Sequence, residues 1–176
     1  PGPWPAASLG DSTRLAVGDI TGTVGMDEDG ALIATPGTVK SIRAFAASWE
    51  YMLDRALFVA PYNSAFGGAA LVDQTGAVVG ITSLRLGEAT YMNLAIPIEQ
   101  FLGDREELIA KGRVESRKPR PWLGLYTRET DGGLVVAGVS PIGPARSAGF
   151  RPGDRIVRVN GEEVSSQADF YRRLWR

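Results

Sequence analysis

The first half of the chain alternates short apolar stretches with glycine-rich or acidic turns, a pattern that predicts β-strands. Between positions 15 and 39 the apolar pieces are separated by Gly and by the acidic turn Met26–Gly30. Two further apolar runs, 69–72 and 77–82, flank Asp73–Gly76, and its Asp and Gly suit the turn of a hairpin. Residues Phe45–Leu57 are ambiguous, because their apolar positions fit either a helix or a loop followed by a strand.

The second half combines predicted strands with short helices. Apolar residues recur at helical spacing over Ile98–Ala110, and Gly112 follows where a helix C-cap would lie. Strands are expected over residues 122–126, 133–139 and 154–159, and a single helical turn over 144–149. A final helix is expected over Ser166–Trp175, because Ser166 is a favourable N-cap and the apolar residues that follow share one face.

A basic stretch separates the two halves. Residues 111–121 contain five Lys or Arg, two Pro and few apolar side chains, which is typical of a solvated hinge between domains. We therefore expect a first domain over residues 1–110, a linker over 111–121 and a second domain over 122–176.

Two absences from the composition restrict the chemistry. The chain has no Cys, which excludes disulfides, thiol nucleophiles and thiolate metal sites. It also has no His, the usual general base and the commonest metal ligand, so a Ser-His-Asp triad cannot be completed within this chain. We expect neither a metal site nor a cofactor.

Charge and hydropathy restrict the partners. A formal net charge of -1 and a pI near 5.6 argue against binding to nucleic acid. No apolar run approaches the length of a membrane span. The N-terminal Pro1–Pro5 lacks the start Met, basic region and apolar stretch of a signal peptide, so we expect the chain to begin partway through a longer protein.

Four motifs in the second domain resemble the PDZ domain of HtrA-like serine proteases. They are Gly133–Val136, Pro144–Phe150, Arg151–Ile156 and Val159–Gly161. The resemblance implies that residues 122–176 form a PDZ domain, which would be cut short at its C-terminal end.

The first domain resembles the second β-barrel of the trypsin-like protease domain in the same family. The resemblance rests on Leu9–Ser12, Val17–Asp19, Leu71–Asp73, Val79–Ile81 and Asn93–Pro97. It implies a mainly β chain, with a trypsin-like second barrel followed by a PDZ domain. It also implies that the first barrel, which carries the His and Asp of the triad in this family, is absent from the chain.

The segment around the expected nucleophile departs from the family pattern Gly-Asn-Ser-Gly-Gly-Pro-Leu. Aligned on Leu71, the chain reads Ala65–Leu71 here, and Gly67 takes the nucleophile position without an oxygen. In the alternative alignment Ser64 is the nucleophile and two residues are inserted before Gly67 and Gly68, the oxyanion-like pair. That insertion would displace the Ser64 hydroxyl from the backbone N–H groups of an oxyanion hole. We therefore expect an inactive site.

The resemblance also implies a peptide-binding groove. The segment 122–125 fits the PDZ carboxylate-binding loop, where successive backbone N–H groups converge on a terminal carboxylate and Gly permits close approach. Strand 125–127 would offer a free edge to the peptide, and helix 168–175 would form the opposite wall. The expected peptide-binding residues are Trp122, Leu123, Gly124, Leu125, Tyr126, Phe170 and Leu174.

These observations predict an HtrA-like homologue that is inactive as a protease and binds peptides or protein C-termini. The alternative is an active endopeptidase in which Ser64 works with a His and an Asp from a barrel outside this chain.

Homo-oligomerisation would raise avidity for peptides. The resemblance implies the periplasm or cell envelope, whereas a Cys-free composition leaves the compartment open. Strand 82–86 either adds a peptide strand or is an ordinary sheet edge.

Overall fold

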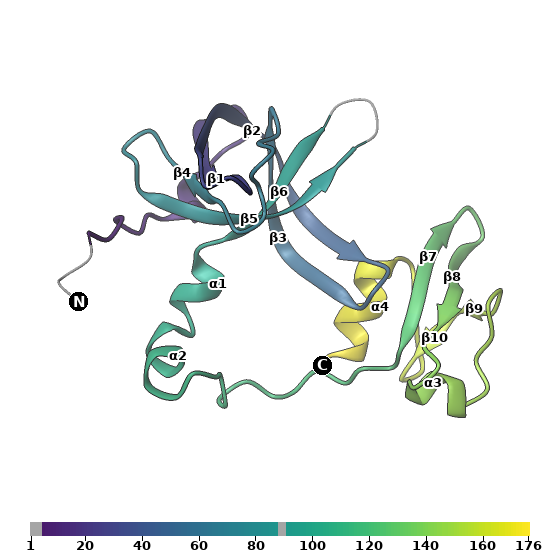
Figure 1. Cartoon of the computed structure of the whole chain (residues 1–176). Coiled ribbons are helices and arrows are strands. Elements are labelled where there is room, and N and C mark those ends of the chain that lie inside the picture. The colour runs from purple at the N-terminus through teal and green to yellow at the C-terminus, as the bar shows by residue number, and fades with distance from the viewer. Residues whose placement is uncertain (1–4, 88–90) are drawn as a thin grey trace. The chain divides into compact units, whose positions relative to one another are not determined.

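The first compact unit of the computed structural model is a closed β-barrel (Figure 1). The structure describes residues 5–87 and 91–176, so Pro1–Trp4 of the expected chain start lie outside the described residues. The unit comprises Pro1–Arg43 and Arg55–Glu115. Its strands follow one another around the barrel in the order β1-β2-β3-β6-β5-β4, and β1 closes the barrel by pairing with β4. They are β1 (Ile20–Met26), β2 (Leu32–Ala47), β3 (Tyr51–Ala60), β4 (Ala70–Val72), β5 (Val78–Leu86) and β6 (Met92–Pro97).

The barrel confirms the expected mainly β fold and resolves the ambiguous segment Phe45–Leu57. This segment forms the end of β2, a turn and the start of β3, and contains no helix. In the barrel β3 lies between β2 and β6, and it pairs with the distant β6 where Leu57 faces Ala95 and Phe58 faces Leu94. Local apolar spacing carries no information about such a distant partner, which is why it left two interpretations open.

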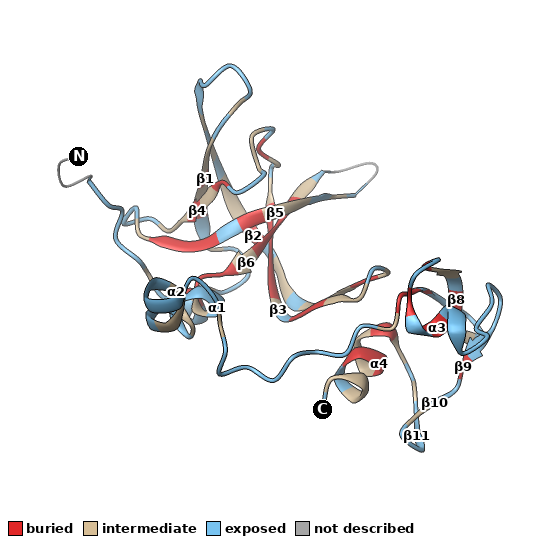
Figure 2. Cartoon of the chain, turned by 60° about the horizontal axis from the view of Figure 1, so that its bottom comes forward, coloured by how far each residue is buried: buried red, intermediate tan, exposed pale blue. Residues whose placement is uncertain are grey.

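Aliphatic side chains from β2 to β6 fill the barrel, and the ribbon of the barrel strands is red in Figure 2 where residues are buried. The buried cluster consists of Val39, Leu57, Val59, Leu71, Val79 and Ala95. A buried polar brace lies beside it, at the short 3-10 helix η1 (Ser12–Arg14). The fully buried Ser12 donates its backbone N–H to Glu99 Oε1 at 2.7 Å, and its carbonyl oxygen accepts from Arg55 Nη2 at 2.7 Å. The brace joins the start of the chain to β3 and to the segment after β6.

The single helix expected over Ile98–Ala110 is instead two short helices. They are α1 (Glu99–Leu102) and α2 (Arg105–Lys111), and Gly103 and Asp104 lie between them. Both residues have lower helix propensity than their neighbours, which favours a break at this point. Gly112 ends α2 as predicted, with a φ of 70° and its N–H donated to the Leu108 carbonyl at 2.8 Å. No helix in the described part of the chain is long and apolar enough to cross a membrane.

The second compact unit comprises Ala44–Asp54 and Ser116–Arg176. Strands β7, β8 and β9 form an antiparallel sheet, and β10 pairs with β11. The elements are β7 (Leu125–Thr130), β8 (Gly133–Val139), α3 (Pro144–Ser147), β9 (Arg155–Ile156), β10 (Arg158–Val159), β11 (Glu162–Glu163) and α4 (Gln167–Leu174). The strand expected over 122–126 begins only at Leu125, and the one expected over 154–159 is divided into β9 and β10.

The core of this unit joins the sheet of β7, β8 and β9 to α3, α4 and the segment Ala44–Asp54, which contains the turn between β2 and β3. The buried cluster consists of Met52, Leu125, Leu134, Val136, Ala145, Ile156, Phe170 and Tyr171. Met52 is the member that comes from Ala44–Asp54, so this short segment contributes to the hydrophobic core of the unit.

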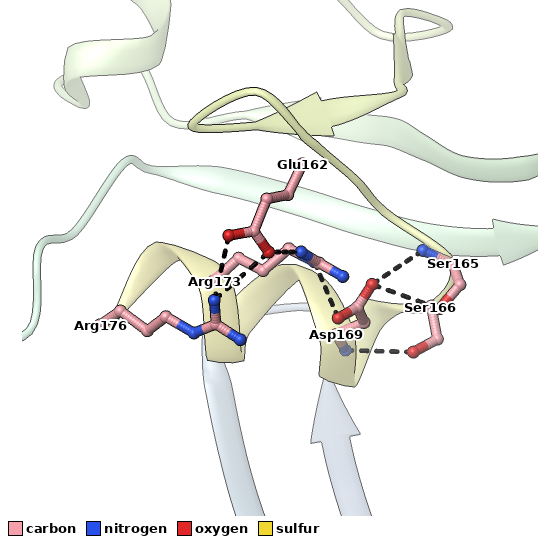
Figure 3. Close-up of polar contacts among 6 residues, drawn as sticks. All are labelled: Glu162, Ser165, Ser166, Asp169, Arg173 and Arg176. Carbon is pink, nitrogen blue, oxygen red and sulfur yellow. Dashed lines mark hydrogen bonds and ion pairs between the residues drawn. The ribbon is translucent and has the colours of Figure 1, made fainter.

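The predicted cap of α4 is present (Figure 3). Ser166 Oγ accepts the Asp169 N–H at 3.1 Å, and the Asp169 carboxylate accepts the Ser165 N–H at 3.0 Å. Asp169 also accepts from Arg173 Nε at 2.9 Å, one turn later. Arg173 also forms an ion pair with Glu162, which connects α4 to β11. Capping and ion pairs together fix the start and the outer face of the helix.

Replacing the capping hydroxyl should weaken this unit. We expect Ser166→Ala to lower the free energy of unfolding by about 1 kcal/mol, because one helix N–H loses its acceptor. The matched control is Ser165→Ala, in which the exposed Ser165 hydroxyl loses its contact with the Asp169 carboxylate. This change should lower the free energy of unfolding by only about a few tenths of a kcal/mol. Urea unfolding followed by tryptophan fluorescence measures the difference, because Trp49, Trp122 and Trp175 all lie in the second unit. Equal losses in the two variants would contradict the capping role.

Candidate functional site

The turn that holds the expected nucleophile lies between β3 and β4 in the barrel unit. Ser64, Gly67 and Gly68 are all exposed on it. Ser64 and Gly67 line an open depression of about 640 Å³, whose other side is the acidic turn Met26–Asp29. Within the described residues, the Ser64 hydroxyl makes no hydrogen bond, and the chain contains no His to act as its base. The structure therefore places Ser64 beside a cavity but gives it no activating partner.

Asn63 is buried beneath this turn and fixes its conformation. Its N–H donates to Asn93 Oδ1 at 2.7 Å, and its Nδ2 donates to the Thr23 and Ile33 carbonyls at 3.0 Å each. Its Oδ1 accepts the Ala65 N–H at 2.7 Å. The Asn63 side chain thus ties the turn to β1 and β2, and its backbone N–H ties the turn to β6. The local sequence carries no signal of this role, because the partners Thr23, Ile33 and Asn93 are distant from Asn63 in the chain.

The contact with Ala65 affects the possible chemistry. An oxyanion hole built around position 67 would use the N–H groups of Gly67 and of the residue two positions earlier, which is Ala65. The Ala65 N–H is already donated to Asn63. Gly68, with a φ of 79°, donates its N–H to the Thr82 carbonyl at 3.0 Å. In this conformation the N–H groups of Ala65 and Gly68 form hydrogen bonds that stabilise the turn itself.

A second candidate site lies in the second unit, where three consecutive N–H groups converge on one carboxylate. The carboxylate belongs to Glu50, and the N–H groups are those of Leu123, Gly124 and Leu125. Leu123 N lies 2.9 Å from Oε2, whereas Gly124 N and Leu125 N lie 2.6 and 2.9 Å from Oε1. We call these three residues the amide nest. Such an arrangement recognises anions, because every donor points at the same charge.

The backbone carbonyls of the nest are hydrogen-bonded to residues in α3 and in the loop that precedes it. The Gly124 carbonyl accepts the Ser140 N–H at 2.8 Å, and the Leu123 carbonyl accepts the Ala145 N–H at 2.9 Å. Gly124 has a φ of 76°, and a Cβ at this position would lie 2.8 Å from the Gly143 Cα. Both features require Gly, so the nest is rigid and depends on this residue.

The remaining expected peptide-binding residues have different environments. Trp122 and Tyr126 are about half exposed, at 50% and 47%. Phe170 is only 2% exposed and belongs to the buried cluster that also contains Met52 and Leu125. Leu174 packs against the same core and is partly buried. Sequence reasoning missed Glu50 and Tyr171, because a Glu in a turn and a Tyr on a helix carry no signal of a site.

Known proteins resemble the chain along nearly its whole length. The PDZ domain family matches residues 121–176. HhoA, a serine protease homologue of Synechocystis sp., is 31% identical over 196 aligned positions, which cover 96% of this chain and 48% of HhoA. The PDZ match and these relatives support an HtrA-like family for the chain. A DegP-like periplasmic serine endoprotease homologue of Pseudomonas savastanoi pv. phaseolicola is 30% identical, over 94% of this HtrA-like chain and 36% of that protein.

A solved structure of the HtrA-type protease AlgW with a decapeptide is also similar to this HtrA-like chain. The TM-score is 0.61 at 26% identity, and the match covers 98% of this chain and 56% of AlgW. The HtrA-like chain thus spans about half or less of the length of the curated relatives described above. In the described ranges 5–87 and 91–176, no group of three His, Cys, Asp or Glu residues is placed to hold a metal ion.

The structural role of Asn63 can be separated from any role of its exposed neighbour. We expect Asn63→Ala to lower the free energy of unfolding by about 2–4 kcal/mol, because it leaves buried backbone groups without partners. Ser64→Ala should change it by less than about 0.5 kcal/mol. Thermal or urea unfolding followed by circular dichroism checks both values. A small effect of Asn63→Ala would show that water can replace the amide in the turn.

Proposed function

We propose that this HtrA-like protein binds the carboxyl-terminal ends of peptides or proteins at the amide nest and does not cleave them. The observation that carries the proposal is the convergence of the Leu123, Gly124 and Leu125 N–H groups on a single carboxylate position. A free chain terminus presents the same charged group. The PDZ match over residues 121–176 supports the same interpretation.

The chemistry of the nest suits a terminal carboxylate. Hydrogen bonds to a charged group contribute about 1.5–3 kcal/mol each, more than those between neutral groups. Beside the nest, β7 begins at Leu125, and its outer edge can accept an extended peptide by strand addition. A carboxylate, a few backbone hydrogen bonds and one apolar side chain together support roughly micromolar affinity.

The proposed lack of cleavage rests on the turn between β3 and β4. Gly67 provides no nucleophilic oxygen at the aligned position, Ser64 has no base among the described residues, and the Ala65 N–H is already donated. The relatives are named as proteases, and that activity is theirs. The DegP-like relative is named as a periplasmic protein, which supports a location in the cell envelope for this protein. Assembly into homo-oligomers would raise its avidity for peptides.

Binding should require a free carboxylate. Octapeptides ending in Ala, Val, Leu, Met or Phe, labelled with fluorescein at the N-terminus, are titrated with the full chain and followed by anisotropy. We expect at least one free-acid peptide to bind. Its C-terminally amidated form should bind with an affinity lower by about tenfold or more, because the nest loses the anion. Equal binding of the acid and the amide would contradict recognition of C-termini.

The same peptide should depend on the glycine of the nest. We expect Gly124→Ala to weaken binding by about tenfold or more, because the Cβ collides with Gly143 and the positive φ becomes strained. The matched control is Gly132→Ala in the turn before β8, where a Cβ meets no atom closer than 3.7 Å. Circular dichroism establishes that both variants are folded. Unchanged affinity in Gly124→Ala would place the peptide elsewhere.

Absence of cleavage is tested with the intact gene product and casein, beside its Ser64→Ala variant. We expect no cleavage by either protein over a period in which trypsin digests the casein completely, because Gly67 has no nucleophilic oxygen and Ser64 has no base among the described residues. Cleavage that disappears in Ser64→Ala would show that Ser64 is the nucleophile of an active endopeptidase. Cleavage by both proteins would equally overturn the proposal.

A further inference from the structure

The amide nest is occupied by a side chain of the same compact unit. Glu50 lies at the tip of the hairpin between β2 and β3, within Ala44–Asp54, and its two carboxylate oxygens receive all three nest N–H groups. This is the position that the proposed function assigns to the terminal carboxylate of a ligand. Two carboxylates cannot share these donors, because their charges repel and the donors are already used.

The backbone of the hairpin tip is held by the other two elements of the binding site. The Ser48 carbonyl accepts the Thr127 N–H of β7 at 3.3 Å, and the Ala47 carbonyl accepts the Tyr171 hydroxyl of α4 at 2.7 Å. The Glu50 N–H in turn donates to the Tyr171 hydroxyl oxygen at 3.1 Å. Burial raises the pKa of the Tyr171 phenol, so the hydroxyl remains a neutral donor near pH 7.

An apolar side chain of the hairpin completes the likeness to a bound peptide. Met52 is 7% exposed and is buried in the same cluster as Leu125 and Phe170. The tip therefore supplies a carboxylate, a hydrogen bond to the β7 edge and a buried apolar side chain. These are the three contacts by which a chain terminus is recognised when it adds to a sheet edge.

The conformation of Glu50 also shows that the nest holds it in place. Its φ is 59°, in the left-handed region, which costs a side chain other than Gly about 1 kcal/mol or more. Such a conformation persists only where surrounding contacts compensate for it. Here the compensating contacts are the three hydrogen bonds to the carboxylate and the one from the Glu50 N–H to Tyr171.

From these contacts we infer that the hairpin tip Ala47–Met52 is an internal ligand of the groove, and that Glu50 must leave the nest before a foreign C-terminus can bind. This inference rests on the proposed function, because it names how that same site is regulated. The apparent affinity for peptides is then the intrinsic affinity reduced by the fraction of molecules in which the tip is released. Any event that withdraws the hairpin opens the site.

The test compares peptide affinity in the full chain before and after the carboxylate is neutralised. We expect Glu50→Gln to bind the free-acid octapeptide about tenfold more tightly or better than the wild type, with little change for the amidated form. Glu28→Gln is the matched control, because it makes the same change of charge on the exposed acidic turn of the other unit. Equal affinity in wild type and Glu50→Gln would overturn the gating and leave peptide recognition intact.

A second variant protects the test against misfolding of the first. Tyr171→Phe removes the hydroxyl that holds Ala47 and Glu50 but keeps the ring, which stacks on Trp175 at a centroid distance of 4.8 Å. It should also tighten peptide binding, by several-fold, because the tip is released more often. Weaker or unchanged binding by a folded Tyr171→Phe protein would count against the inference.

A measurement without peptide separates the two proposals. Amide hydrogen exchange of Leu123, Gly124 and Leu125 should accelerate about tenfold or more in Glu50→Gln, because the three N–H groups lose a charged acceptor. Unchanged exchange would show that Glu50 does not occupy the nest in solution and would overturn the inference. Faster exchange without any peptide binding would overturn the proposed recognition of C-termini, and the gating of that recognition with it.

Discussion

Three backbone N–H groups that point at one place require an anion there. In the second unit the positive φ of Gly124 turns the N–H groups of Leu123, Gly124 and Leu125 to the same side, and bonds from Ser140 and Ala145 to the carbonyls hold them in that orientation. Donors that are buried without an acceptor would be costly. The Glu50 carboxylate meets this requirement, and the hairpin tip, the Tyr171 hydroxyl and the buried Met52 are all arranged around that contact.

The barrel unit follows the same rule with a neutral side chain. Asn63 uses its amide to satisfy two strand carbonyls and the Ala65 N–H, and its own N–H is satisfied by Asn93. These hydrogen bonds hold the turn in place. The exposed Ser64 on the same turn has no hydrogen-bond partner among the described residues. The two candidate sites therefore differ in kind. One is a set of donors directed at a charge, and the other is a turn whose donors stabilise the turn itself.

This difference supports the proposal that the HtrA-like protein binds peptides without cleaving them. Catalysis needs a nucleophile, a base and oxyanion donors at once, so the loss of any one of them removes most of the activity. Binding a carboxylate needs only oriented backbone N–H groups, which survive changes in most side chains. A groove of this kind can also be regulated by a carboxylate from its own chain, because the nest does not distinguish a side-chain carboxylate from a terminal one.

The sequence by itself determined the elements that depend on local physics. Short apolar stretches between glycine-rich or acidic turns predicted strands in the barrel, Ser166 predicted the start of α4, and the absence of His excluded a complete triad within the chain. The PDZ motifs indicated where Gly124 and its neighbours would lie. Tertiary structure decided which groups these residues meet. The pairing of β2 with β3 made Phe45–Leu57 part of a hairpin, burial placed Phe170 in one cluster with Met52, and folding brought Glu50 to N–H groups more than seventy positions away. Periodicity and propensity describe neighbours along the chain, whereas these contacts depend on partners that only the fold brings together.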